Sequence, residues 1–226
     1  MNFLLMILIF GASMLAQMYL TSTYSRFSRI RNGRDLTGAE VARGLLDSNG
    51  LQSVSVEMVP GQLTDHYDPI HKAVRLSEGN YSQPSLAALA VAAHEVGHAI
   101  QDAKAYAPLV VRFRLAPVLS VSANLGQFAL MIGIFMLASS FGQTMLLIGI
   151  AGLGAALLFH LVTLPVEFDA SRRALLILEK DGYLTREENA GARSVLTAAA
   201  MTYVVAALGA LATLAHYLGF LRRSED

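Results

Sequence analysis

Long stretches without charged side chains dominate the hydrophobic pattern of this chain. Residues 3–20 form an uncharged, mainly apolar run of 18 residues, which is near the lower limit for a helix that crosses a bilayer. Residues 115–166 and 194–221 are uncharged as well, and the polar segment 139–143 divides the first of these two stretches. The pattern therefore predicts four transmembrane helices, of which the middle two form a hairpin.

Shorter elements are predicted in the polar region between the first two spans. Thr37 and Glu40 match a capping box that begins an amphipathic helix, and the helix should end near Asn49. Apolar and polar residues alternate at 54–58, and residues 73–77 follow a turn. These two segments predict the strands of a small sheet.

A further helix is predicted to begin at Ser82 or Ser85 and to continue to about Gln101. Its first half is apolar, but the eight residues 86–93 are too few to cross a bilayer. We therefore expect this helix to pack inside a domain near the membrane surface.

The composition is typical of a membrane protein. Of the 226 residues, 54% are hydrophobic and only 15% are charged, and the mean hydropathy is +0.47. The formal net charge is zero, and no run of Lys or Arg interleaves with aromatic residues, so we expect no nucleic-acid partner. The absence of Cys excludes disulfides and Cys-liganded zinc sites.

Positive charge is distributed unevenly about the predicted spans. Four arginines follow the first span directly: Arg26, Arg29, Arg31 and Arg34. Of the 17 Lys and Arg, 15 fall on one side, and only Arg222 and Arg223 fall on the other. A signal peptide would carry its positive charge before the apolar run, so an uncleaved anchor is favoured. The positive-inside rule then predicts a multi-pass protein of the cell membrane whose domain between the first two spans is cytoplasmic.

Candidate chemistry lies in the helix predicted up to Gln101, which contains the pattern His94-Glu95-Val96-Gly97-His98. On a helix, His94 and His98 lie on one face and can bind one zinc ion through two imidazoles. Glu95 would lie beside the metal, where its carboxylate can take a proton from a zinc-bound water. The pattern predicts a zinc enzyme with Glu95 as its catalytic base.

A catalytic zinc ion usually has a third protein ligand. Two predicted spans separate His98 from Glu167, so Glu167 should return to the side of the membrane that holds the motif. We expect Pro165 to break or kink the third span and Glu167 to begin the helix that follows. Glu167 is therefore the predicted third ligand, and the alternatives are His66, His71, His160 and His216.

These elements predict a mainly α membrane protein with about four transmembrane helices and a small α+β zincin-like catalytic domain between the first and the second. The predicted parts follow one another along the chain. They are an N-terminal anchor (1–25), a metallopeptidase domain (26–114), a helical hairpin (115–164), a helix with the third ligand (165–193), and a last span with a short tail (194–226).

Several blocks of the sequence resemble the bacterial membrane-bound neutral zinc metallopeptidases of the YugP-like family. The blocks cover residues 63–69, 74–77, 92–101, 164–171, 191–196 and 198–204. The order of strand, motif helix, hairpin and following Glu is more distantly similar to the HtpX-like and Ste24-like peptidases. The resemblance implies one zinc ion per chain, held by His94, His98 and Glu167, with Glu95 in catalysis. In the wider group an Asp often braces a ligand His from the position of Ser171, whereas Asp169 should point elsewhere on the helix.

The predicted function is that of a membrane-bound, gluzincin-like zinc metalloendopeptidase. It would hydrolyse membrane-associated peptides or proteins with a zinc-activated water. Candidates for oxyanion or substrate contacts are His66, Tyr67, Arg193 and Tyr203. Residues 73–77, if they form an edge strand, could pair with an extended substrate.

Two other classes of protein stay open. The first is a zinc transporter, although the motif lies outside the long apolar runs. The second is a membrane scaffold or chaperone that holds a structural zinc ion.

Overall fold

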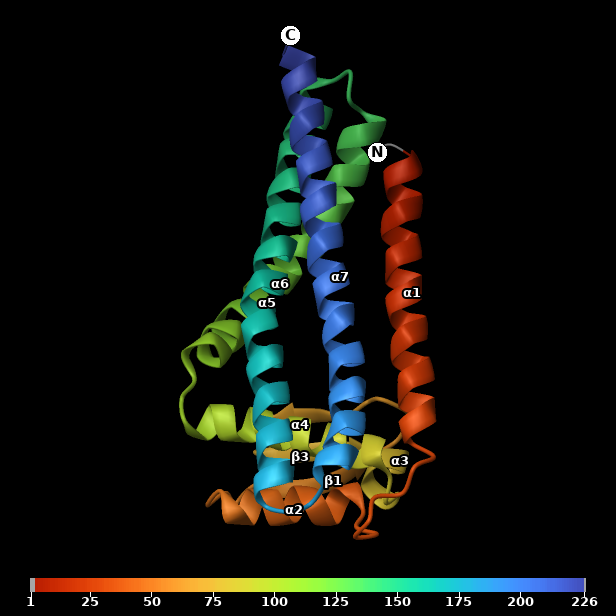
Figure 1. The fold of residues 1–226 in the computed structure, drawn as a ribbon. Coiled ribbons are helices and arrows are strands. Elements are labelled where there is room, and N and C mark those ends of the chain that lie inside the picture. Colours follow the sequence, from red (N-terminus) through yellow and green to blue (C-terminus); the bar gives the residue numbers. More distant parts are fainter. Residues whose placement is uncertain (1–2, 226) are drawn as a thin grey trace. The chain divides into compact units, whose positions relative to one another are not determined.

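The computed structural model of the chain describes residues 3–225, with side chains for residues 3–219 (Figure 1). Its helices are α1 (Phe3–Phe27), α2 (Gly38–Ser48), α3 (Glu78–Ser82), α4 (Leu86–Ala103), α5 (Ala107–Phe135), α6 (Ser140–Lys180) and α7 (Arg186–Glu225). Its strands are β1 (Ser55–Val59), β2 (His66–Asp68) and β3 (Ala73–Ser77). The protein is thus mainly helical, as predicted. Among the described residues, four helices (α1, α5, α6 and α7) are long and apolar enough to cross a membrane.

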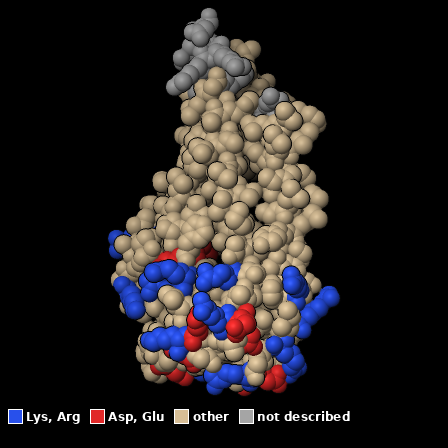
Figure 2. Space-filling view, in the orientation of Figure 1, with Lys and Arg blue, Asp and Glu red and all other residues tan. Residues whose placement is uncertain are grey.

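The chain divides into two compact units. One, here called the helical unit, contains the described residues up to Leu15, Val110–Leu164 and the described residues from Thr202 onward. The other, here called the mixed unit, contains Ala16–Leu109 and Pro165–Met201. On the face drawn in Figure 2, charged side chains gather over the mixed unit, and the surface of the helical unit is mostly uncharged.

The mixed unit differs from the domain that the sequence predicts. A domain formed only by the segment between the first two long helices is not supported, because the end of α6 and the start of α7 belong to the same compact unit. Their apolar residues Leu178 and Val195 join one core with Leu45 and Leu89. Local patterns could not predict this, because the core joins segments that the α5–α6 hairpin separates along the chain.

Within the helical unit, α5 and α6 are antiparallel neighbours that approach through glycine. A Cβ atom added to Gly126 would lie 2.5 Å from the Cα atom of Gly152, and one added to Gly149 would lie 2.6 Å from the Cα atom of Leu130. Small residues allow backbones to come this close, which is the usual basis of helix association in a bilayer.

The small sheet has the strand order β1-β3-β2, with β1 parallel and β2 antiparallel to β3. Strand β3 has the predicted bounds, and β1 begins one residue later than predicted. Residues 73–77 are the central strand and not an edge, so the condition for pairing this strand with an extended substrate is not met. Residues 66–68 add a third strand, which is too short to give an alternating pattern, and this strand covers the second side of β3.

Helix α2 begins and packs as its sequence predicts. The Thr37 hydroxyl accepts a hydrogen bond from the Glu40 N–H, and the Glu40 carboxylate accepts one from the Thr37 N–H. The apolar face with Val41, Leu45 and Leu46 is fully buried. Each such side chain stabilises the fold by about 1.5–3 kcal/mol relative to an exposed position.

Helix α4 is the central element of the mixed unit. The Ser85 hydroxyl accepts a hydrogen bond from the Ala88 N–H at 3.1 Å, so of the two predicted starts the structure has the second. The helix contacts α2, α3, β2 and β3, and nearly all of its residues are buried. Its many alanines leave room for these neighbours on several sides.

The prediction that Pro165 separates two helices is wrong. Helix α6 continues through Pro165 to Lys180, so Glu167 lies inside it. Proline removes one N–H donor, but the flanking hydrogen bonds preserve a long helix where neighbouring helices pack against it. Residues 165–193 therefore contain the end of α6, a turn and the start of α7 rather than one helix.

Helices α4 and α6 lie close together at Gly97. A Cβ atom at this position would lie 2.7 Å from the carbonyl oxygen of Ala170 and 3.2 Å from its Cα atom. Only glycine fits here without a shift of the α6 backbone. The contact lies one turn from Glu167, so it determines how near that carboxylate can come to α4.

We predict that Gly97→Ala lowers the thermal unfolding temperature of the purified protein in detergent. Overpacking of this kind costs about 1–3 kcal/mol. Gly154→Ala is the matched control, because a Cβ atom at this helical glycine meets nothing within 4 Å. The control should be unchanged or slightly more stable. Equal unfolding temperatures of the two variants would contradict the close approach.

Candidate metal centre

Three side chains from two helices converge in the mixed unit. His94 and His98 come from α4 and Glu167 from α6, and their ligand atoms all lie within 4.8 Å of one another. The Oε2 atom of Glu167 is 3.3 Å from Nε2 of His94 and 3.7 Å from Nε2 of His98. The Glu167 side chain is only 5% exposed. The structure thus brings together the three residues that the sequence analysis selected as metal ligands.

The two imidazole rings share one face of α4 because they are four residues apart. Their centroids are 4.7 Å apart, and their planes cross at 84°. Both rings present Nε2 to the same carboxylate, which leaves Nδ1 of each ring for other partners. Those partners determine which nitrogen carries the proton.

Gln101 fixes the orientation of His98. Its amide nitrogen donates to the Val166 carbonyl and to Oδ2 of Asp169, each at 2.9 Å. Its Oε1 atom must therefore be the acceptor for Nδ1 of His98, which is 3.0 Å away. A neutral His98 with the proton on Nδ1 presents an unprotonated Nε2 beside Glu167.

Ser171 makes the corresponding contact with His94. Its hydroxyl oxygen lies 3.1 Å from Nδ1 of His94, one turn after Glu167 on α6. A serine hydroxyl can accept a hydrogen bond from Nδ1–H of His94, although it carries no charge. Among the described residues, Asp169 makes no hydrogen bond to either imidazole, and its carboxylate instead accepts a hydrogen bond from Gln101.

The sequence analysis did not select Gln101. The residue is fully buried although it is polar, and it lies three positions after His98. A polar residue one turn after a ligand, on a helix that is otherwise apolar, is the signal that could have identified it.

Two side chains of α4 near Glu167, Glu95 and His98, have pKa values above their ordinary values. Burial raises the pKa of Glu95 above its ordinary value, although both neighbouring histidines oppose the shift. Burial disfavours the charged form of His98, but the Glu167 and Glu95 carboxylates outweigh this and raise the pKa of His98. Glu95 is 7% exposed and lies outside the group of three ligand atoms.

The other predicted contact residues have different surroundings. His66 lies on β2 with its ring exposed, and its Nδ1 atom is 2.9 Å from the Thr64 carbonyl. The Tyr67 hydroxyl donates to Asp102 at 2.7 Å, and burial together with this carboxylate raises the pKa of Tyr67. Arg193 lies on the part of α7 that belongs to the mixed unit, whereas Tyr203 belongs to the helical unit. The structure thus gives the Tyr67 hydroxyl another partner.

The donor set defines the class of site. Two imidazoles and one carboxylate suit a zinc ion, and a catalytic zinc site has three protein ligands and a fourth position for water. In the described part of the chain, no other group of at least three His, Cys, Asp or Glu converges in this way. The three side chains therefore fit a single metal ion of this type.

Comparison with known proteins agrees with this class. The chain matches the model of the family described as "Putative neutral zinc metallopeptidase" over residues 2–222. It is 42% identical over 216 residues to the Bacillus subtilis (strain 168) protein named "Putative membrane protease YugP", covering 96% of this chain and 94% of that protein. No solved structure matches the chain.

The chain belongs to this family of neutral zinc metallopeptidases, as the resemblance predicted. The more distant similarity to the HtpX-like and Ste24-like peptidases stays a prediction.

We predict that Gln101→Met lowers the apparent zinc affinity by about 10- to 100-fold, since residues that orient a ligand imidazole typically have effects of this size. Methionine has nearly the same volume but cannot bond to Nδ1 of His98. Affinity would be measured by competition with a fluorescent zinc chelator, and the exposed Gln83→Met would be the control. Equal affinities in the two variants, with unfolding temperatures also equal, would rule out this role of Gln101.

Proposed function

We propose that this protein is a membrane-bound, zinc-dependent metalloendopeptidase that holds one zinc ion per chain with His94, His98 and Glu167. The observation that supports this most directly is the convergence of these three side chains in a member of a neutral zinc metallopeptidase family. The family membership implies a peptide or protein substrate, and we propose that the substrate is associated with the membrane.

A zinc ion held by His94, His98 and Glu167 would supply Lewis-acid chemistry, which activates a water and polarises the scissile carbonyl. Glu95 is the general base. Its carboxylate takes the proton of the attacking water and then donates it to the leaving amine nitrogen. Burial beside the two ligand histidines suits this role, because it raises the pKa of Glu95 toward that of a group that both accepts and releases a proton.

The remaining polar residues hold the ligands in place. Gln101 keeps the proton of His98 on Nδ1, and Ser171 can do the same for His94, so both Nε2 atoms present lone pairs. His66 and Arg193 remain the candidates for substrate or oxyanion contacts, since both have exposed side chains in the mixed unit.

The other two classes have less support. Helix α4, which carries both histidines, is not among the described helices that could cross a membrane, whereas a transport site is expected within the spans. A structural zinc site usually has four protein ligands, whereas three converge here.

We predict that Glu95→Gln keeps about one zinc ion per chain but loses at least roughly 10²-fold in turnover, because the amide cannot accept the proton. Metal content would be measured by elemental analysis, and turnover by cleavage of fluorophore-labelled casein in detergent. Glu78→Gln is the control, since this exposed carboxylate lies at the start of α3. Normal cleavage by the Glu95 variant would exclude Glu95 as the base.

We also propose that the protein lies in the cell membrane with its metal centre on the cytoplasmic side. Support comes from the 15 Lys and Arg between Arg26 and Arg193, against the two at Arg222 and Arg223. Because His98 and Glu167 converge, the chain between them must cross the membrane an even number of times. Helices α5 and α6 supply two candidate spans.

The orientation can be tested with single cysteines, because the chain has none of its own. Glu78 and Ser140 are both exposed and lie on α3 and at the start of α6. A membrane-impermeant thiol reagent applied to whole cells should label Ser140→Cys but not Glu78→Cys. Labelling of Glu78→Cys alone would reverse the orientation, and labelling of both or neither would exclude the proposed crossing between them.

A further inference from the structure

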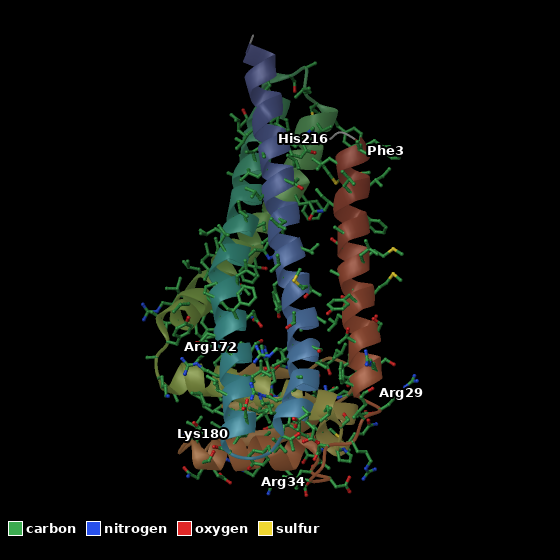
Figure 3. The ribbon with its side chains drawn as sticks, in the orientation of Figure 1. Phe3, Arg29, Arg34, Arg172, Lys180 and His216 are labelled. Carbon is green, nitrogen blue, oxygen red and sulfur yellow. The ribbon has the colours of Figure 1, made fainter. Side chains whose placement is uncertain are left out.

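A second feature of the mixed unit is a cavity of about 300 Å³ between α6 and α7. These two helices are antiparallel neighbours joined by a short turn, and they carry all the residues that line the cavity. None of the three ligand residues of the metal centre is among them. Figure 3 labels Arg172, which lines the cavity from α6, and Lys180, which ends that helix and does not line it.

The two ends of the cavity differ, because large apolar side chains line one end and a carboxylate and an amide line the other, with further leucines between them. At one end, Phe168 of α6 faces the same space as Met201 of α7. Arg172 and Arg193 follow in the middle, and Glu179 and Asn189 line the other end. A ligand that fills this space must have an apolar part, then an anionic group, then a group that donates hydrogen bonds.

Asn189 at the polar end has an acceptor without a partner. Its amide nitrogen donates to the Leu175 carbonyl at 3.1 Å and to the Glu179 carboxylate at 3.0 Å, which assigns the amide orientation because both partners are acceptors. The Oδ1 atom is buried and, among the described residues, has no donor. The Asn189 residue is only 4% exposed, so this acceptor destabilises the fold unless a ligand supplies a donor.

The charged residues that line the cavity indicate which charged groups a ligand would carry. Within the described part of the chain, no hydrogen bond or ion pair joins the Arg193 guanidinium to another residue, whereas Arg172 pairs with Asp169 at 2.8 Å. Arg193 is thus available for an anion such as a phosphate. Glu179 and Oδ1 of Asn189 lie one to two turns further from the apolar end and suit a cation that carries N–H donors.

We propose that this cavity binds a phospholipid with a primary-amine headgroup, of the phosphatidylethanolamine type. Its parts occur in the order that the lining requires: acyl chain, phosphate, ammonium. The chain lies along Phe168 and Met201, the phosphate pairs with Arg193, and the ammonium donates to Glu179 and to Oδ1 of Asn189. The zinc ligands do not line this cavity, and lipid binding needs no zinc ion, although Arg193 is also a candidate for substrate contacts in the proposed peptidase.

A lipid is a better match than a peptide for two reasons. Both lining helices are long and apolar enough to cross a membrane, and the cavity lies on the ends of these helices that belong to the mixed unit, next to their long apolar stretches. Its apolar end is also bordered by large side chains that are partly exposed. Phe168 is 49% exposed and Met201 40%.

The choice of lipid probes makes the test specific. The full-length protein would be purified in detergent and titrated with phosphatidylethanolamine, phosphatidylcholine and phosphatidylglycerol of identical chains, with bound lipid counted by native mass spectrometry. Phosphatidylcholine has the same charges but no N–H donor, and phosphatidylglycerol lacks the cation. We expect phosphatidylethanolamine to bind at least about tenfold more tightly than either. Glycerophosphoethanolamine and inorganic phosphate, which have no acyl chains, should not compete at equal concentration.

Two variants locate the site. Arg193→Gln should reduce phosphatidylethanolamine binding about tenfold, and Glu179→Gln should remove most of its preference over phosphatidylcholine. Lys180→Gln is the matched control, because it removes an exposed charge from α6 that does not line the cavity. All three positions are exposed, so these variants should fold, and their unfolding temperatures would be checked.

The outcomes are decisive in both directions. Equal affinity for phosphatidylethanolamine and phosphatidylcholine, or an equal loss in the Lys180 and Arg193 variants, would overturn the proposal. Displacement of the lipid by short apolar peptides, together with the absence of any headgroup preference, would reassign the cavity to a peptide. Because lipid binding is measured with Glu95→Gln as well as with the unaltered protein, failure of the proposed peptidase function would leave this result unaffected.

Discussion

The close approach of α4 and α6 is the constraint on which the metal centre depends. His94 and His98 lie on one helix, and Glu167 lies more than sixty residues later on the other, so the three meet only if the two backbones are nearly in contact. Gly97, inside the motif, makes this contact against the backbone of Ala170. A residue that is variable in the pattern His-Glu-x-x-His therefore has a defined role in this fold, because its missing side chain lets the third carboxylate reach the histidines.

The same segment of α6 supplies both a ligand and the groups that orient the other two. Glu167 faces the histidines, the Val166 carbonyl and Asp169 hold Gln101, and Ser171 contacts His94. Since these groups lie within six residues of one helix, a shift of α6 moves all of them together. The alternative, in which ligand and orienting groups come from different loops, would let their geometry change independently. The buried polar network also keeps its members satisfied, which a low-dielectric interior requires.

Prediction from the sequence was successful where the determining information is local. The capping box at Thr37, the strand 73–77 and the motif helix depend on neighbouring residues, and the structure has them. The proximity of Glu167 to His94 also followed, because the even number of spans between them is visible in the hydropathy. The end of α6 was not predictable in this way: Pro165 disfavours a helix locally, but packing on both sides preserves it.

Tertiary contacts explain the other differences. Strand β2 has only three residues, and its pairing with β3 depends on a partner rather than on its own pattern. The position of Gln101 one turn after His98 could mark it as a candidate. Its local sequence could not show that its amide is held in place, because Val166 and Asp169, which hold it, are more than sixty residues away. Tertiary contacts also determine which segments form the mixed unit, because residues before and after the long hairpin complete one core.

Helix α6 has two different faces in the mixed unit, and their spacing explains how one helix can take part in both proposed sites. Ala170, Ala174 and Leu178 recur every four residues and are buried, so this face packs into the core beside Glu167. Phe168, Arg172 and Glu179 lie on the face that lines the cavity shared with α7. Ser171 lies between the two faces: it lines that cavity, and its hydroxyl contacts His94. The cavity and a candidate metal-binding imidazole thus share one side chain, Ser171.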